Sequence, residues 1–161
     1  MGSRADTAVN WTKRHGAWFG LAGPTIFIGG WLTAGALRPD YSPINDAISQ
    51  LARLGAPNRA VMTSAFIGFG LSLPIFGQAL AEALDDGKGV EYAAALAGLA
   101  TLGVAAFPLA ARSGGREDLL HTIWAVAGYV GTASAPLIAS RAFFRHHQRA
   151  AAVIARQPPI G

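Results

Sequence analysis

Asp118 and His121 are the two side chains whose types and spacing come closest to those of catalytic groups. They are three residues apart, so in a helix they lie on the same face. A carboxylate beside a histidine can orient the ring as a general base, and Ser42 or Ser49 can supply a nucleophile. The sequence has no G-x-S-x-G turn or other pattern that would complete a hydrolase. It therefore leans against an enzyme and assigns no catalytic residue.

Residues that bind metals and cofactors are sparse. The absence of cysteine excludes thiolate metal sites and disulfides. Glu117, Asp118 and His121 supply part of a ligand set, but neither H-x-x-x-H nor H-E-x-x-H spacing occurs. A bis-histidine haem needs two histidines at a similar depth, and His15 is expected at the opposite end of the molecule from His121. We therefore predict no metal and no cofactor, and a single-histidine tetrapyrrole site has no supporting motif.

The elements that must position these side chains are apolar. Of the 161 residues, 52% are hydrophobic and 14% are charged, whereas a soluble domain has about 25% charged residues. Four apolar runs are each close to the ~20 residues that cross a bilayer as a helix. They cover residues 16–37, 60–80, 92–111 and 119–140. The sequence therefore predicts an all-α fold, an integral membrane four-helix bundle formed by residues 16–141.

Basic residues indicate the orientation of the bundle. With the N-terminus inside, eight Lys and Arg lie in the inner segments and five in the outer loops, a bias that favours cytoplasmic termini. Residues 1–15 then form a cytoplasmic N-terminal segment and residues 142–161 a basic cytoplasmic tail. We expect the protein in the bacterial inner membrane, surrounded by lipids. Its basic residues form no single face or run, so the pI near 10.1 does not predict a nucleic-acid partner.

A short amphipathic helix is expected between the first two spans, over residues 43–54. Ser42 is a favoured N-cap and Pro43 a favoured first helical residue, while Gly55 and Pro57 give a stop signal. The predicted apolar face consists of Ile44, Ala47, Ile48, Leu51 and Leu54. A helix of about 12 residues is too short to span a bilayer, so it should lie in the interface. It is either a connector that packs its apolar side down or a lid over a polar pocket.

Polar residues from two loops are expected to meet on the outer side of the membrane. This topology brings the loop after the first span close to the loop before the fourth. We call the candidates for a site the outer polar cluster: Tyr41, Ser42, Asp46, Ser49, Arg116, Asp118 and His121. Arg53, Arg112 and Glu117 are expected nearby. His121 carries most of the interest because an ionisable group at membrane depth is a candidate for function. Alternatively, it simply hydrogen-bonds a neighbouring helix.

Prolines and small residues describe how the spans pack. Pro24, Pro74 and Pro136 each interrupt a span, and each is either a kink for packing or a kink that opens a cavity. Small residues recur four apart and predict close contacts between helices. These pairs are Gly16 with Gly20, Ala94 with Gly98, and Gly131 with Ala135.

Several short motifs follow one another in a recognisable order. Residues 41–57, YSPINDAISQLARLGAP, contain Y-S-P, I-S-x-L and G-A-P ahead of an apolar span with G-x-G-L. Phe107-Pro108, a polar loop and His121 come later. Over roughly residues 16–141 the chain resembles the membrane family catalogued as "domain of unknown function 998". The resemblance implies a multi-span membrane bundle and supplies no function.

The chain departs from the pattern that the resemblance implies. Gln50 stands where family members usually have Glu, Ala52 and Arg53 are extra residues, and Leu109 stands where an acidic residue usually follows F-P. Relatives also tend to have about six spans rather than four. Acid chemistry at these two positions is therefore not expected in this chain.

Two classes of function remain open. One is a structural or accessory subunit of a larger membrane complex, whether respiratory, photosynthetic or transport-related, with other membrane subunits as partners. The other is a lipid- or small-molecule-binding protein or enzyme, with an outer-face pocket near His121 that Tyr41, Ser42 and Asp118 help to form. A coupled transporter is disfavoured, because no charged residue sits in the middle of a span and no inverted repeat is evident.

Overall fold

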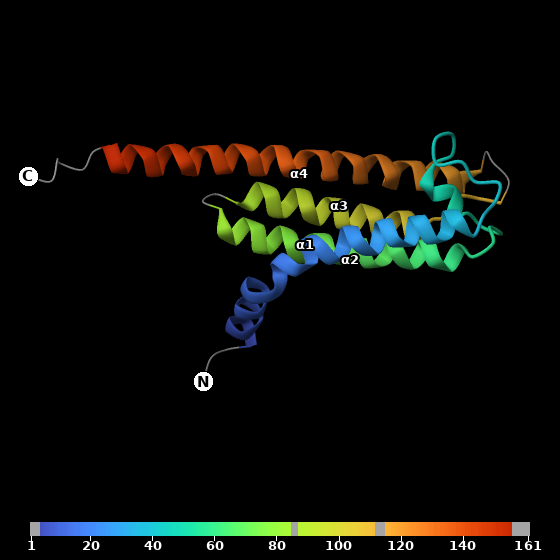
Figure 1. Cartoon of the computed structure of the whole chain (residues 1–161), viewed down its shortest axis with the longest axis horizontal. Coiled ribbons are helices and arrows are strands. Elements are labelled where there is room, and N and C mark those ends of the chain that lie inside the picture. The colour runs from blue at the N-terminus through green and yellow to red at the C-terminus, as the bar shows by residue number, and fades with distance from the viewer. Residues whose placement is uncertain (1–3, 85–86, 112–114, 156–161) are drawn as a thin grey trace, which may run out of the picture.

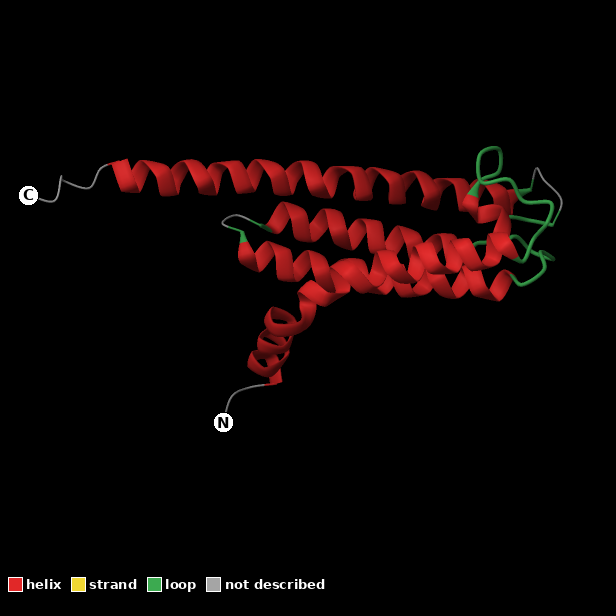
Figure 2. Cartoon of the chain, viewed as in Figure 1, coloured by secondary structure: helices red, strands yellow, loops and turns green. Residues whose placement is uncertain are grey.

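Helices and loops make up the part of the chain that the structure describes (Figure 2). The computed structural model describes the backbone of residues 4–84, 87–111 and 115–155, and the side chains of those residues between 15 and 145. The helices are α1 (Arg4–Ala36), the 3₁₀ helix η1 (Ile48–Ala52), α2 (Arg59–Ala83), α3 (Lys88–Ala106) and α4 (Arg116–Ala155). The all-α fold predicted from the sequence is confirmed.

Each of the four long helices contains a stretch that is long and apolar enough to cross a membrane. The stretches are His15–Ala36, Arg59–Ala83, Lys88–Ala106 and Arg116–Arg145. At 1.5 Å per residue, their 19 to 30 residues extend about 28–45 Å, which matches a hydrocarbon core of about 30 Å. A helix is the natural form for such a sequence, because it satisfies its backbone hydrogen bonds internally where no water is present.

Two helix ends differ from the predicted spans. α3 ends at Ala106, five residues before the predicted limit of 111, because a residue that precedes proline disfavours the α conformation and Pro108 follows Phe107. α4 continues to Ala155, so the expected tail begins as an extension of the fourth span. This helix runs well past the ends of α2 and α3 (Figure 1).

The helices pack in chain order. α1 contacts α2, α2 contacts α3, and α3 contacts α4, whereas the described residues of α1 and α4 make at most a marginal contact with each other. The loops that follow α1 and α3 lie together at one end of the bundle, and the two termini lie toward the other end (Figure 1). We call the end of the bundle that carries these two loops the loop end. A hydrogen bond from the Leu54 amide to the Leu109 carbonyl, 2.9 Å long, joins its two loops and confirms that they share one side.

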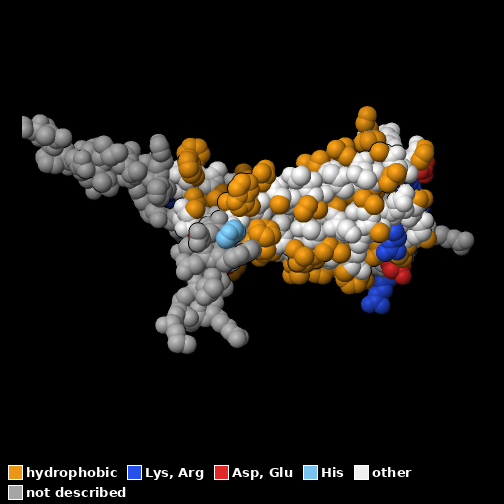
Figure 3. All heavy atoms as spheres, turned by 60° about the horizontal axis from the view of Figure 1, so that its bottom comes forward, with side chains coloured by type: hydrophobic (Ala, Val, Ile, Leu, Met, Phe, Trp, Pro, Cys, Tyr) orange, Lys and Arg blue, Asp and Glu red, His pale blue; other side chains and the backbone are white. Residues whose placement is uncertain are grey.

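Burial follows from this order. In the most apolar stretches of α2 and α3, 33% and 50% of residues are buried, against 11% in α1 and 6% in α4. The outer helices therefore turn apolar side chains outward, as a surrounding lipid phase allows. Apolar side chains spread along the flank of the bundle, while charged ones are prominent at the loop end (Figure 3).

Small residues set the distance between neighbouring helices. A Cβ atom added to Gly98 in α3 would lie 2.6 Å from the Gly70 carbonyl oxygen and 2.7 Å from Cδ of Pro74, both in α2. A Cβ atom on Gly131 in α4 would lie 2.7 Å from the Ala97 amide nitrogen in α3. Only glycine allows these backbones to approach so closely. The close contacts predicted at Gly98 and Gly131 are therefore confirmed.

The segment between α1 and α2 does not form the predicted helix over residues 43–54. Ser42 begins a turn, in which the Asp46 amide donates to the Ser42 carbonyl at 2.8 Å and the Asp46 carboxylate accepts a hydrogen bond from the Ser42 amide at 2.8 Å, an arrangement typical of a helix start. The turn does not continue into a helix. The backbone is then extended at Ala47 (ψ 142°), and only the 3₁₀ helix η1 follows.

The predicted amphipathic face is correspondingly wrong in its first half. Ile44 is 94% exposed, and Ala47 is exposed as well. Leu51 and Ala52 are buried in a core cluster with Met62 and Phe66. η1 therefore packs into the end of the bundle over one turn, in place of the expected helix of three turns lying flat in the interface.

Candidate functional site

A cavity of about 360 Å³ lies between α1 and α4, and we call it the lateral cavity. α2 and α3 form its floor, and η1 closes it at the loop end. Its lining comprises Pro24, Phe27 and Ile28 of α1, Ile48 and Ser49 of η1, Phe66 and Phe69 of α2, Thr101 and Val104 of α3, and His121, Ala125, Gly128, Tyr129 and Thr132 of α4. Ile28 is 49% exposed and Tyr129 is 76% exposed. The cavity therefore opens sideways between these two side chains, toward the surrounding lipid.

The wall formed by α4 is a single stripe along the helix. Its residues recur at three- and four-residue intervals from His121 to Thr132, as one face of an α-helix requires. Eleven residues correspond to about 16 Å, so the cavity reaches from the loop end well into the span. Pro24 forms part of the opposite wall.

His121 is the buried polar group of this cavity. It is 4% exposed, and its Nδ1 lies 2.8 Å from the Phe107 carbonyl oxygen. A carbonyl oxygen accepts hydrogen bonds and cannot donate them. Nδ1 therefore carries the proton and donates it, and in the neutral ring Nε2 holds an unshared lone pair. His121 thus makes the hydrogen bond to a neighbouring helix that the sequence analysis gave as one alternative. Its second ring nitrogen, Nε2, remains for another partner.

Asp118 binds the same loop as His121. Its Oδ1 accepts a hydrogen bond from the Ala110 amide at 2.9 Å, while His121 holds the Phe107 carbonyl. The two side chains share a face of α4, as their spacing predicts, but these bonds go to two points of the α3–α4 loop. They fix the loop against the start of α4. In the described hydrogen bonds, His121 is oriented by the Phe107 carbonyl rather than by the Asp118 carboxylate.

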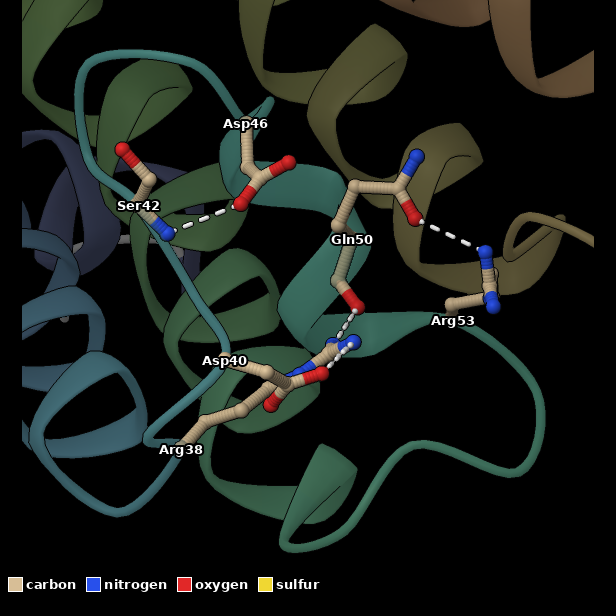
Figure 4. A network of polar contacts seen from close by, with 6 residues as sticks. All are labelled: Arg38, Asp40, Ser42, Asp46, Gln50 and Arg53. Carbon is tan, nitrogen blue, oxygen red and sulfur yellow. Dashed lines mark hydrogen bonds and ion pairs between the residues drawn. The ribbon is translucent and has the colours of Figure 1, made fainter.

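The remaining members of the outer polar cluster lie in several places. Tyr41 accepts a hydrogen bond from Nε1 of Trp31 at 3.0 Å. Ser42 and Asp46 belong to the local turn before η1 (Figure 4). Arg116 is exposed at the start of α4. Only Ser49 and His121 line the lateral cavity, so the structure divides the cluster between the cavity and the loop surface.

A network that the sequence did not reveal stabilises the loop end (Figure 4). Arg38 donates to the Gln50 carbonyl oxygen at 2.7 Å and forms an ion pair with Asp40 at 3.1 Å. Arg53 donates to Oε1 of Gln50 at 3.2 Å. The hydrogen bond from Arg38 lowers the pKa of the Asp40 carboxyl. Gln50 thus holds η1 between two arginines.

The hydroxyl groups of Thr101, Tyr129 and Thr132 line the cavity but were not predicted as site residues, because they belong to no sequence motif. Thr101 is buried and donates to the Ala97 carbonyl at 2.8 Å, which satisfies its hydroxyl within its own helix. Tyr129 and Thr132 lie farther along the α4 stripe. The spacing of three and four residues from His121 to Thr132 is the sequence signal that places Tyr129 and Thr132 on the same helix face as His121.

The chemistry of the cavity is apolar with neutral hydrogen-bonding groups. None of the described residues that line it carries a carboxylate, an ammonium or a guanidinium group. Over the described part of the chain, no three His, Asp or Glu side chains come together as metal ligands would. The arrangement suits an uncharged, largely apolar molecule that hydrogen-bonds at one end.

These features define the class of the molecule as a membrane protein whose described residues form four helices long and apolar enough to span a bilayer, with a cavity that opens to the side. The family described as "Protein of unknown function (DUF998)" matches residues 21–156. The chain belongs to this family, and the resemblance seen in its motifs is confirmed. A search of curated proteins and a search of solved structures each found no match.

Proposed function

We propose that the protein binds a lipid-like small molecule that enters the lateral cavity from the bilayer. The observation that carries the proposal is the lateral opening between α1 and α4, because the described residues of these helices make at most a marginal contact with each other and the lining is mostly apolar. A cavity of about 360 Å³ lies within the range of roughly 300–1,000 Å³ that is usual for small-molecule sites.

The polarity of the cavity matches the polarity of a membrane lipid. His121 lies five residues from the start of α4, about 7.5 Å along the helix, and Ser49 lies in η1 at the same end. Phe27, Phe69 and Val104 supply apolar surface. A bound lipid would place its polar group near the loop end and its chain along the α4 stripe, because apolar walls gain dispersion contacts only when the cavity is filled.

Filling the cavity tests this proposal. Ala125 lines it, while Val126 is its neighbour on the outer surface of α4 and is 54% exposed. Ala125→Phe should displace the bound molecule, and Val126→Phe, the matched control, should not. Lipid that remains with the purified protein is measured by native mass spectrometry, and thermal unfolding confirms that both variants fold. Equal lipid retention in the two variants would contradict the proposal.

A second candidate is the accessory subunit of a larger membrane complex. Two features of α4 favour this candidate. The helix projects beyond the bundle (Figure 1), and only 6% of the residues in its most apolar stretch are buried. Most of its surface is therefore open to a partner helix. Mild solubilisation of native membranes distinguishes the candidates. A stable complex of fixed stoichiometry supports the subunit, and a solitary chain with bound lipid supports the first proposal.

We also propose the bacterial inner membrane, with both termini in the cytoplasm, as the location. The chain contains no cysteine, so single cysteines report accessibility without background labelling. A cysteine that replaces Ile44, which is 94% exposed at the loop end, should react with a membrane-impermeant maleimide from outside. A cysteine at Lys88, at the opposite end of the bundle, should react only after permeabilisation. The reverse pattern would invert the proposed orientation.

A further inference from the structure

From the hydrogen bond that His121 makes to Phe107 we infer that the molecule bound in the lateral cavity is a long-chain lipid alcohol, whose uncharged hydroxyl group donates a hydrogen bond to Nε2 of His121. The inference rests on the proposed function and names the class of its ligand. It starts from the described bond between Nδ1 of His121 and the Phe107 carbonyl oxygen, which is 2.8 Å long.

The Phe107 carbonyl decides which hydrogen-bonding group His121 offers. Phe107 follows the last residue of α3, and its carbonyl oxygen can only accept. The proton of the neutral ring is therefore held on Nδ1, and Nε2 can only accept. A ligand group that is also only an acceptor, such as an ester, ether or ketone oxygen, would face this lone pair without a proton between them. A hydroxyl group supplies the proton.

Ser49 completes the set of partners that a hydroxyl needs. It lies in η1, lines the same cavity as His121, and is only partly exposed. Its hydroxyl can donate to the oxygen of the ligand while the hydroxyl of the ligand donates to Nε2 of His121. The ligand oxygen thus acts as donor and acceptor at once, as an alcohol oxygen does.

The lining argues against a charged headgroup. A phosphate or carboxylate leaving water needs positive groups or several donors to offset its lost hydration. The described lining residues provide no ammonium or guanidinium group. Arg38 and Arg53 contact η1 by bonding the carbonyl and side chain of Gln50, and they are not part of the lining.

The length of the cavity favours a chain rather than a compact alcohol. The α4 wall extends from His121 to Thr132, about 16 Å along the helix. Along this distance Phe27, Phe69 and Gly128 contribute apolar or small surface. A single long alkyl chain fits a narrow cavity that opens to the bilayer along its side.

The experiment compares 1-hexadecanol with its methyl ether, 1-methoxyhexadecane, on the full chain in lipid nanodiscs. The two probes share the alkyl chain, and only the alcohol can donate. Competition measured by native mass spectrometry should show the alcohol binding roughly ten-fold more tightly, as the loss of one buried hydrogen bond predicts. Equal binding of the two probes to the wild-type cavity would overturn the inference, and this comparison needs no variant.

Variants then assign the preference to His121. His121→Asn keeps a donor at the δ position for the Phe107 carbonyl and lacks the ε nitrogen, so the preference should fall to near one-fold. Ser49→Ala should reduce it by a smaller factor. Thr122→Val removes a hydroxyl that is exposed beside His121 and does not line the cavity, and it serves as the matched control, with the preference unchanged. A ten-fold preference that persists in a folded His121→Asn protein would also overturn the inference.

Failure of the proposed function looks different from failure of this inference. If neither probe binds the wild type more than it binds the filled variant Ala125→Phe, no lipid occupies the cavity and the proposed function fails. If both probes bind the wild type equally and Ala125→Phe excludes both, the cavity binds lipid chains without recognising a hydroxyl. Only the inference about the alcohol then fails.

Discussion

Replacing Gly98 by alanine tests the packing of the two central helices, which form the floor of the lateral cavity. The new Cβ atom would lie 2.6 Å from the Gly70 carbonyl oxygen, whereas ordinary contact begins at 3.4 Å. The backbones of α2 and α3 must therefore separate locally by about 0.8 Å, since a carbonyl oxygen within a helix cannot rotate away as a side chain can. Such a shift would loosen the floor near Phe69 and Thr101.

Gly29 of α1 provides a matched control for the size of the effect. A Cβ atom at this position would meet nothing within 4 Å. Both substitutions remove the conformational freedom of a glycine in mid-helix, which stabilises by roughly 0.5–1 kcal/mol. Because this contribution is common to both, the difference between the variants isolates the overpacking, which costs about 1–3 kcal/mol. Gly29→Ala should be as stable as the wild type or slightly more stable, and Gly98→Ala should be less stable.

The free energy of unfolding is measured by titrating the purified protein in mixed micelles with a denaturing detergent and following helix content. The wild type and the two variants are compared under one protocol. Equal stability of Gly98→Ala and Gly29→Ala would refute the contact between α2 and α3 at Gly98. Loss of stability in Gly29→Ala would show instead that the outer face of α1 is covered.

Two further predictions concern the loop end. Trp31→Phe removes the hydrogen bond to the Tyr41 hydroxyl, and the loss of this bond should lower the free energy of unfolding by about 0.5–1.5 kcal/mol. The double variant with Tyr41→Phe tests the pair. If its loss of stability equals the sum of the losses in the two single variants, the two groups do not interact. Arg38→Gln should raise the pKa of Asp40, because the hydrogen bond from Arg38 lowers it. The ion pair contributes above the ordinary carboxyl pKa and is lost as the pH falls through the lowered value. An NMR titration of the Asp40 carboxyl that is identical in wild type and variant would contradict this assignment.

The number and type of the helices could be predicted because they depend on composition. A run of about 20 apolar residues leaves its backbone no partner in a bilayer except itself, so the four spans follow from residues 16–37, 60–80, 92–111 and 119–140 alone. The family could also be identified from short motifs, which the match over residues 21–156 confirms. Which helix packs against which could not be predicted. Small-residue pairs occur in three of the four spans, and their sequence does not indicate which helix each pair contacts.

The segment around η1 shows where local signals fail. Ser42 and Pro43 favour a helix start in any context, and the turn at Ser42 forms. The helix does not continue, because the backbone is extended at Ala47 and the next residues turn Leu51 and Ala52 into the core. Propensity describes single residues, whereas burial of Leu51 depends on α2, which arrives later in the chain.

The chain by itself determined a membrane bundle and singled out His121 as an ionisable residue at membrane depth. Only the tertiary structure decided the chemistry of its ring, because the carbonyl that binds Nδ1 belongs to Phe107, fourteen residues earlier. It also decided that the described residues of α1 and α4 make at most a marginal contact, which leaves the lateral cavity between these helices. Both outcomes depend on contacts between distant segments, and hydrophobic periodicity carries no information about those.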